Sequence, residues 1–210
     1  MEHRARKRFG QNFLTDSTII DRIVMAINPD TDDKLIEIGP GLGALTCPLI
    51  KQIGKLDVIE LDRDIIPKLR LNCGLQGELN IHNVDVLKFD FAELYDGKHK
   101  LRIIGNLPYN ISTPIIFHLV KYASMIRDMH FMLQKEVVQR LAAAAGSTDY
   151  SRLSVMAQLH FRLTPLFLVP AEAFNPHPKV ESALVKPVPP SSPPVHIDDR
   201  PLFDRRRSKA

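Results

Sequence analysis

The sequence contains no tryptophan, only two cysteines and no long apolar run. A membrane-spanning helix needs about 20 consecutive apolar residues, and no stretch of this chain provides them. The first ten residues, "MEHRARKRFG", are basic and have no apolar signal region behind them. These absences predict a cytoplasmic protein with no membrane partner.

The few cysteines and the histidines lack the spacing of metal ligands. Cys47 and Cys73 stand alone, outside any CxxC or Cys/His pattern. Isolated thiols of this kind are typical of buried structural residues, so we expect neither a disulfide nor a nucleophile. The eight histidines also show no HxxxH spacing. The sequence therefore predicts no metal site.

Positive charge gathers at the two ends of the chain, although the net charge is only +4 and the pI about 9.1. The basic residues at the ends are Arg4, Arg6, Lys7, Arg8, Arg205, Arg206, Arg207 and Lys209. Such runs are often solvated tails. Basic ends around a folded body also suit a polyanion such as nucleic acid, and this pattern keeps that class of partner open.

Short β-type runs alternate with helical patterns along most of the chain, which is typical of an α/β sheet. We expect strands at 34–38, 56–61, 79–82, 101–105, 129–133, 166–169 and 183–188. We expect helices at 43–53, 63–72, 112–122, 135–145 and 151–161. The pattern predicts a Rossmann-like domain with seven strands and helices on both faces of the sheet.

A proline-rich segment follows this domain. Five prolines occur among residues 187–194, and proline cannot propagate a helix or a central strand. We therefore predict a domain over 1–186 with a basic N-terminal arm at 1–15, and a linker over 187–199. Residues 200–210 are too few to fold alone.

A glycine-rich turn, "EIGPGLG" (37–43), stands between an expected strand and an expected helix. Gly39 and Gly41 permit a tight turn and let a ligand approach the helix N-terminus. Glu60 ends the next strand about 20 residues on, where a carboxylate can accept both ribose hydroxyls of a nucleoside cofactor. Asp85 follows the third strand and either bonds an adenine amino group or caps a helix. These strand ends predict one crevice at the carboxyl edge of the sheet.

Two cofactors fit such a crevice. Gly39, Gly41 and Ala44 satisfy the permissive G-x-G-x-x-A dinucleotide pattern, so NAD remains open. NAD carries a pyrophosphate, which favours a nearby cation, whereas S-adenosylmethionine carries a sulfonium and an ammonium. The acidic residues around the loop favour S-adenosylmethionine.

The loop "NLPY" (106–109) follows the fourth strand at the same edge. The amine of adenine is a poor nucleophile because its lone pair is delocalised into the ring. The Asn106 side-chain oxygen and the Leu107 carbonyl can accept the hydrogens of that amine and favour its pyramidal form. Pro108 fixes the turn, and Tyr109 offers a ring on which a base can stack. Our hypothesis is that this loop clamps the N6 amine of an adenine.

Seven segments, in order from about residue 7 to 186, resemble the bacterial small-subunit rRNA adenine N6-dimethyltransferase family. They are "FGQNFL" (9–14), "EIGPGLGALT" (37–46), "VIELDRD" (58–64), "GNLPYNISTP" (105–114), "MLQKEVVQRL" (132–141), "RLSVMAQ" (152–158) and "FNPHPKVESA" (174–183). The resemblance implies a class I methyltransferase fold and S-adenosylmethionine as cofactor. It also implies dimethylation of two adjacent adenosines in a 3′-terminal hairpin of 16S rRNA, within an immature 30S subunit.

The same resemblance assigns site residues. It implies that Asn12, Leu14, Gly39, Glu60, Asp85 and Asn106 contact the cofactor. It further implies that Asn106, Leu107, Pro108 and Tyr109 clamp the base, that Phe174 helps to hold it, and that the enzyme is a monomer. The family pattern continues past the linker into a small helical domain, of which 200–210 would be the start, with the rest missing here.

Three alternatives stay open at this point. Large-subunit macrolide-resistance methyltransferases share the fold and an Asn-x-Pro-Tyr loop, although "NLPYNISTP" with "FNPHPKVESA" suits the small-subunit group better. A non-catalytic ribosome assembly factor would keep the fold, but the intact Asn106, Pro108 and Tyr109 argue against lost chemistry. A Rossmann-type oxidoreductase is the third alternative. The NLPY loop and the absence of a plausible acid or base near it in this sequence argue against that class of enzyme.

Overall fold

The computed structural model describes residues 12–191. The basic clusters predicted at both ends of the chain, most of the N-terminal arm and most of the linker lie outside these residues. Within 12–191, no helix has both the length and the apolar character needed to cross a membrane.

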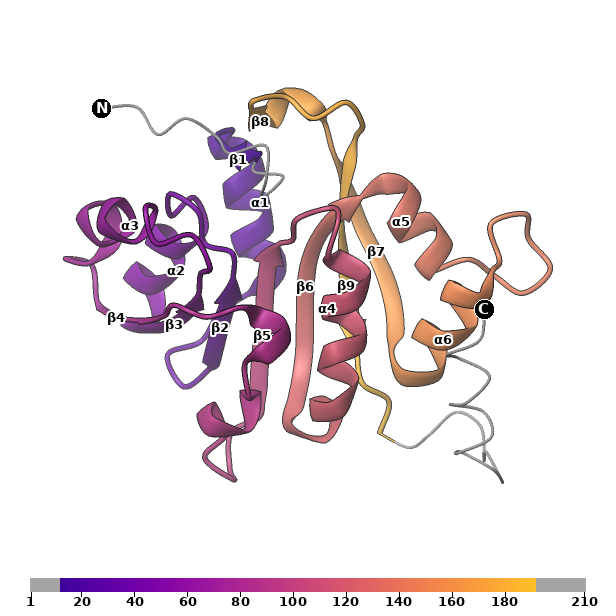
Figure 1. Cartoon of the computed structure of the whole chain (residues 1–210), viewed down its shortest axis with the longest axis horizontal. Coiled ribbons are helices and arrows are strands. Elements are labelled where there is room, and N and C mark those ends of the chain that lie inside the picture. The colour runs from indigo at the N-terminus through magenta and orange to yellow at the C-terminus, as the bar shows by residue number, and fades with distance from the viewer. Residues whose placement is uncertain (1–11, 192–210) are drawn as a thin grey trace.

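A seven-stranded sheet forms the centre of the molecule (Figure 1). Its strands are β2 (Lys34–Ile38), β3 (Lys55–Ile59), β4 (Glu78–His82), β5 (Leu101–Asn106), β6 (Ile126–Gln134), β7 (Arg162–Val169) and β9 (Ser182–Val188). Their order is β4-β3-β2-β5-β6-β9-β7, and β9 runs antiparallel to both of its neighbours. The chain order reverses between β2 and β5, and ligands of open α/β sheets bind at such a switch point.

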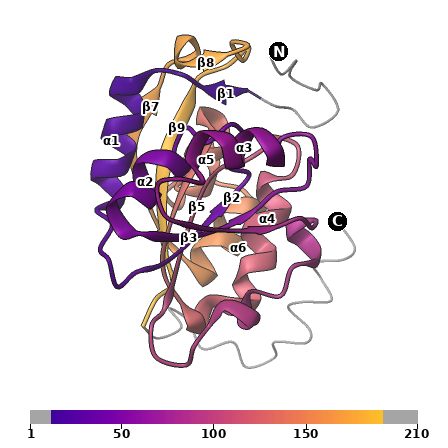
Figure 2. The same ribbon diagram turned by 90° about the vertical axis from the view of Figure 1, so that its left-hand side faces the viewer.

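Helices cover both faces of this sheet (Figures 1 and 2). They are α1 (Ser17–Ile27), α2 (Thr46–Ile53), α3 (Ile66–Cys73), α4 (Ser112–Leu119), α5 (Lys135–Leu141) and α6 (Arg152–His160). Alternate strand residues point to opposite faces. Ile36 and Ile38 accordingly pack in one core with α4, α5 and α6, whereas Leu35 packs in a second core with α1, α2 and α3. The two cores fix the sheet between its helical layers.

The predicted seven-strand fold is confirmed, with small changes at the ends of elements. Strand β9 continues to Val188, so the first two residues of the predicted linker pair with β7. The helix predicted over 112–122 ends at Leu119 and continues as a 3₁₀ turn, Val120–Met125. Helix α1 was not predicted.

A second, two-stranded sheet lies near the carboxyl edge of the large sheet, where the glycine turn follows β2. Strand β1 (Phe13–Leu14) pairs antiparallel with β8 (Phe174–Asn175), and the Thr15 amide donates to the Ala173 carbonyl at 2.8 Å. This pairing joins the start of the described chain to the segment between β7 and β9.

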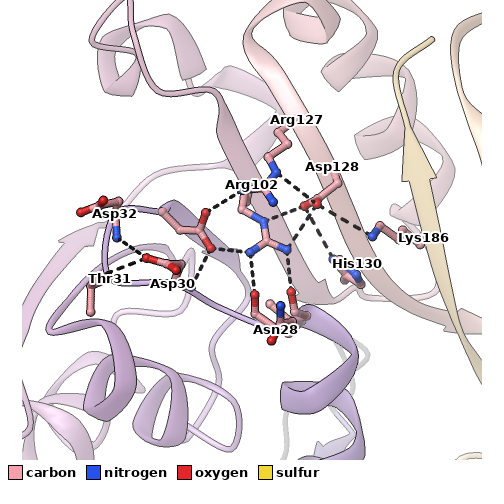
Figure 3. A network of polar contacts seen from close by, with 11 residues as sticks. Asn28, Asp30, Thr31, Asp32, Arg102, Arg127, Asp128, His130 and Lys186 are labelled. Carbon is pink, nitrogen blue, oxygen red and sulfur yellow. Dashed lines mark hydrogen bonds and ion pairs between the residues drawn. The ribbon is translucent and has the colours of Figure 1, made fainter. Parts of the chain in front are cut away.

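A buried polar network holds the opposite, amino edge of the large sheet (Figure 3). Arg102 of β5 is only 3% exposed. Its guanidinium donates to Asp128 of β6 at 2.9 Å, to the Ile27 carbonyl at 2.6 Å and to the Asn28 carbonyl at 3.2 Å, and it also pairs with Asp33. The network therefore ties the end of α1 and the loop before β2 to two central strands.

Cys47 and Cys73 form a disulfide, with their Cα atoms 4.8 Å apart. The expectation of two separate thiols was therefore wrong. The cause is the packing of two helices: Cys47 lies in the first turn of α2, and Cys73 is the last residue of α3. Spacing along the chain does not reveal which helices pack together.

Candidate active site

A cavity of about 660 Å³ opens at the carboxyl edge of the sheet, beside the switch point between β2 and β5. Its volume lies within the usual range of small-molecule sites. Ten of the predicted site residues line it: Asn12, Leu14, Gly39, Gly41, Glu60, Asp85, Asn106, Leu107, Pro108 and Tyr109. The structure therefore places the residues predicted to bind the cofactor and the residues of the NLPY loop around the same cavity.

The glycine turn follows β2 directly and forms the floor between the sheet and α2. Gly39 and Gly41 have φ angles of +68° and +55°, in the left-handed region that favours glycine. The Gly39 amide donates to the Ile59 carbonyl at 2.9 Å, which fixes the turn against β3. A Cβ atom on Gly41 would lie 3.2 Å from the Phe13 ring. The positive φ angles of the turn favour glycine at both positions, and at Gly41 the close approach of Phe13 adds to this preference.

Glu60 lies directly after β3 and is 8% exposed. Its carboxylate accepts a hydrogen bond from the Asp62 amide at 2.8 Å, and the Asn83 side chain donates to its backbone carbonyl at 2.7 Å. Burial raises the pKa of the Glu60 carboxyl, and hydrogen bonds from the Asp62 and Gly41 amides partly offset this. The side chain is therefore held at the cavity by both of its neighbouring turns.

Asp85 has the capping role that the sequence left open. Its carboxylate accepts from the Leu87 amide at 3.0 Å and begins the 3₁₀ turn Val86–Lys88. The same residue lines the cavity. A contact between Asp85 and an adenine amino group stays a prediction.

Glu37 also lines the cavity, and sequence reasoning did not select it. It lies on β2 and is 2% exposed, and the Thr46 hydroxyl donates to its carboxylate at 2.6 Å. Burial raises the pKa of the Glu37 carboxyl to about 7, and the charge of Glu60 contributes in the same direction. The signal was its place as the first residue of the segment "EIGPGLG", but its burial depends on how α2 packs.

The NLPY loop begins at Asn106, the last residue of β5. The Asn106 side-chain amide donates to the Asn12 carbonyl at 3.1 Å. This bond uses one of the two N–H groups of the amide, fixes which way the amide points, and leaves the side-chain oxygen as the acceptor for a ligand. The Leu107 amide donates to the Met132 carbonyl at 3.2 Å, and the Ile111 amide donates to the Pro108 carbonyl at 3.1 Å. The loop is thus anchored to β6 and closed as a turn.

Tyr109 lines the cavity, and its hydroxyl shares a hydrogen bond of 2.8 Å with the Ser182 hydroxyl. Burial raises the pKa of the Tyr109 phenol. Ser182 begins β9 and is fully buried. The sequence segment around Ser182 was recognised, but its contact with Tyr109 was not.

Phe174 is the one predicted site residue that does not line the cavity. Its side chain is 1% exposed and packs in the core beside α1. Its backbone pairs with Leu14 in the small sheet, and Leu14 and Phe13 do line the cavity. A direct contact between Phe174 and a base stays a prediction, and it would require the ring to leave this core.

The charge of the cavity distinguishes between the two cofactors considered above. Glu37, Glu60 and Asp85 line it, and among residues 12–191 no lysine or arginine does. A pyrophosphate would find no cationic partner on these walls, whereas a sulfonium and an ammonium find acceptors. The same described part of the chain contains no group of three or more histidine, cysteine or acidic side chains placed to bind a metal ion.

A crevice at the switch point of a seven-stranded sheet, with one reversed strand near its edge, defines a class I S-adenosylmethionine-dependent methyltransferase. Residues 2–205 match the ribosomal RNA adenine dimethylase family. The chain belongs to that family.

Individual relatives agree with this assignment. The chain is 59% identical over 206 residues to ribosomal RNA small subunit methyltransferase A of Chromohalobacter salexigens, covering 96% of this chain and 73% of the relative. The crystal structure of a dimethyladenosine transferase from Plasmodium falciparum is 32% identical with a TM-score of 0.75, covering 85% of this chain and 63% of that one. The 23S rRNA methyltransferase ErmE is 25% identical with a TM-score of 0.76, covering 94% and 76%.

Proposed function

We propose that this enzyme transfers methyl groups from S-adenosylmethionine to the N6 amines of two adjacent adenosines in a 3′-terminal hairpin of 16S rRNA. It would act as a cytoplasmic monomer on an immature 30S subunit. Identity of 59% to a small-subunit enzyme, against 25% to a large-subunit enzyme, supports the choice of subunit. The observation that carries the chemistry is the Asn106 amide, whose NH₂ group is bound by the Asn12 carbonyl at the wall of the cavity.

The proposed chemistry rests on two acceptors at the end of β5. In the first transfer, Asn106 Oδ1 and the Leu107 carbonyl accept the two hydrogens of the adenine amine; in the second transfer, one of them accepts the single hydrogen that remains. In each case the lone pair of the amine is directed at the methyl group. The Tyr109 ring stacks on the flipped base, a contact that contributes about 1 to 3 kcal/mol per base. The methylated amine is first cationic and readily loses its extra proton to solvent, so no strong general base is needed. Catalysis then depends mainly on positioning.

Residues on the opposite wall would hold the cofactor. The Glu60 carboxylate would accept hydrogen bonds from the ribose hydroxyls, and the Asp85 carboxylate would accept one from the adenine amino group. The backbone at Gly39 and Gly41 would allow the cofactor to approach closely. Leu14 of β1 and Asn12, the residue before β1, would cover the cofactor. When bound, S-adenosylmethionine supplies the electrophilic methyl group.

The test is incubation of the protein with tritiated S-adenosylmethionine and unmethylated 30S subunits, followed by nucleoside analysis. We expect N6,N6-dimethyladenosine in 16S rRNA. Methylated 23S rRNA in a parallel incubation, with 16S rRNA unlabelled, would contradict the choice of subunit.

A silent reaction calls for a longer chain, because this chain spans 73% of the Chromohalobacter relative. Cofactor binding, measured by calorimetry, first shows that the fold is intact. Recovery of methylation with a chain extended beyond Ala210 would assign RNA docking to the added residues. Continued silence would favour the assembly-factor alternative and overturn the proposed function.

A further inference from the structure

The hydrogen bond between Tyr109 and Ser182 joins the NLPY loop to a distant strand. Ser182 is 73 residues further along the chain and is completely buried. Tyr109 lines the cavity, and its hydroxyl lies 2.8 Å from the hydroxyl of the serine. This hydrogen bond ties the phenol end of the Tyr109 side chain to β9.

The position of Ser182 is itself fixed from both sides. Ser182 pairs with Gln134 at the end of β6 and with Val169 at the end of β7. The residue before it, Glu181, accepts a backbone hydrogen bond from Lys135 at 2.9 Å, and the two side chains form an ion pair at 2.8 Å. The ion pair is exposed and contributes little by itself. The strand pairing and the backbone bond nevertheless fix the backbone around Ser182 to three elements, β6, β7 and α5. The position of the serine hydroxyl follows from this.

We infer that Ser182 is a positioning residue for methyl transfer, whose hydroxyl holds the Tyr109 ring in the orientation on which the target adenine stacks. The inference rests on the proposed function. Without this hydrogen bond, the Tyr109 side chain can leave its rotamer and the base loses a fixed stacking surface. Binding of the RNA through its phosphates and binding of the cofactor at Glu60 do not involve this bond. The effect should therefore fall on kcat and spare both KM values.

A double-mutant cycle tests this directly, with the full chain, S-adenosylmethionine and unmethylated 30S subunits. We expect Ser182→Ala and Tyr109→Phe each to lower kcat roughly 3- to 10-fold, the range that corresponds to one lost hydrogen bond. The double variant should be no slower than Tyr109→Phe, because both changes remove the same interaction. The KM for 30S subunits and the Kd for the cofactor should match the wild type.

Ser154→Ala is the matched control. Ser154 is as completely buried as Ser182, but its hydroxyl donates to the Arg140 carbonyl and does not touch the cavity. This variant should lower Tm without changing kcat, which separates loss of a buried hydroxyl from loss of positioning.

Three results would overturn the inference: wild-type kcat in Ser182→Ala, wild-type kcat in Tyr109→Phe, or fully additive effects in the double variant. If Ser182→Ala does not fold, Tyr109→Phe alone still decides. A wild-type protein that methylates neither 30S subunits nor 23S rRNA would instead overturn the proposed function, and the inference with it.

Discussion

Asn106 is the side chain on which the proposed chemistry most depends. Replacing it with alanine removes the acceptor for the adenine amine, and we expect kcat to fall at least about 100-fold, as for loss of one preorganised transition-state contact. Tm should change little, because the side chain makes one hydrogen bond, to the Asn12 carbonyl. The measurement is methyl transfer to 30S subunits beside thermal unfolding. Asn80→Ala, on β4 and away from the cavity, is the control. Substantial activity in Asn106→Ala would rule out the clamp.

Glu37 should couple cofactor binding to the release of a proton. Its carboxyl is buried and has a pKa of about 7, so near pH 7 about half of the free protein carries a proton there. A cationic ligand in the cavity favours the charged carboxylate and lowers this pKa. Calorimetry of S-adenosylmethionine binding at pH 7, in two buffers with different ionisation enthalpies, should therefore show net proton release. Glu37→Gln should release fewer protons. Equal release from both proteins would show that Glu37 does not sense the ligand.

At the scale of elements, Gly105 sets the approach of β5 to β2. A Cβ atom at this position would lie 2.5 Å from the Ile38 carbonyl oxygen, which is backbone and cannot turn away. Gly105→Ala should force the strands apart at the switch point, lower the free energy of unfolding by about 2 kcal/mol or more, and weaken cofactor binding. Urea unfolding and calorimetry measure both effects. Gly97→Ala is the control, because a Cβ there meets nothing within 4 Å. This variant should lower the free energy of unfolding only through the strain of alanine at a positive φ. Equal stability of the two variants would contradict this account.

Local pattern predicted the elements well where one segment carries the whole signal. The seven strands are short apolar runs between turns, and each appears in the sheet. Helix α1 was missed although its signal was present: Asp16 caps it, and Ile19, Ile23 and Ile27 recur at helical spacing. Strands β1 and β8 are two residues each and pair across most of the chain, so no local pattern reveals them.

The part of the site that lies at the carboxyl ends of the strands could be predicted from the sequence. Gly39, Glu60, Asp85 and Asn106 meet because the carboxyl ends of parallel strands share one edge. The roles of Glu37 and Ser182 depend on burial by other elements, and the disulfide depends on helix packing. These contacts arise only in the folded chain, so spacing in the sequence could not supply them.

The amino edge of the sheet, at the other end of the strands from the active site, carries charges that the active site does not use. Arg102, Asp128 and Lys186 surround His130 on β6 (Figure 3). His130 is 2% exposed, and neither ring nitrogen makes a hydrogen bond of normal length to a described residue, although Nδ1 lies 3.9 Å from the Asp128 carboxylate. Burial lowers the pKa of His130 to about 4; the charge of Asp128 and the backbone at Ala26 oppose this, and the charges of Lys186 and Arg102 assist it. The folded protein therefore keeps this histidine neutral.

This neutral histidine should make the protein sensitive to acid. The pKa in the unfolded chain is near 6.5, above the folded value, so the unfolded chain binds the proton more tightly and stability is lost as pH falls from about 6.5 toward 4. Between pH 7 and pH 5 the loss from this one group is about 2 kcal/mol. His130→Leu removes the titrating group, so urea unfolding should show a smaller difference between the two pH values. The same acid-induced loss in the variant would mean that carboxylates of the network, and not His130, control stability at the amino edge.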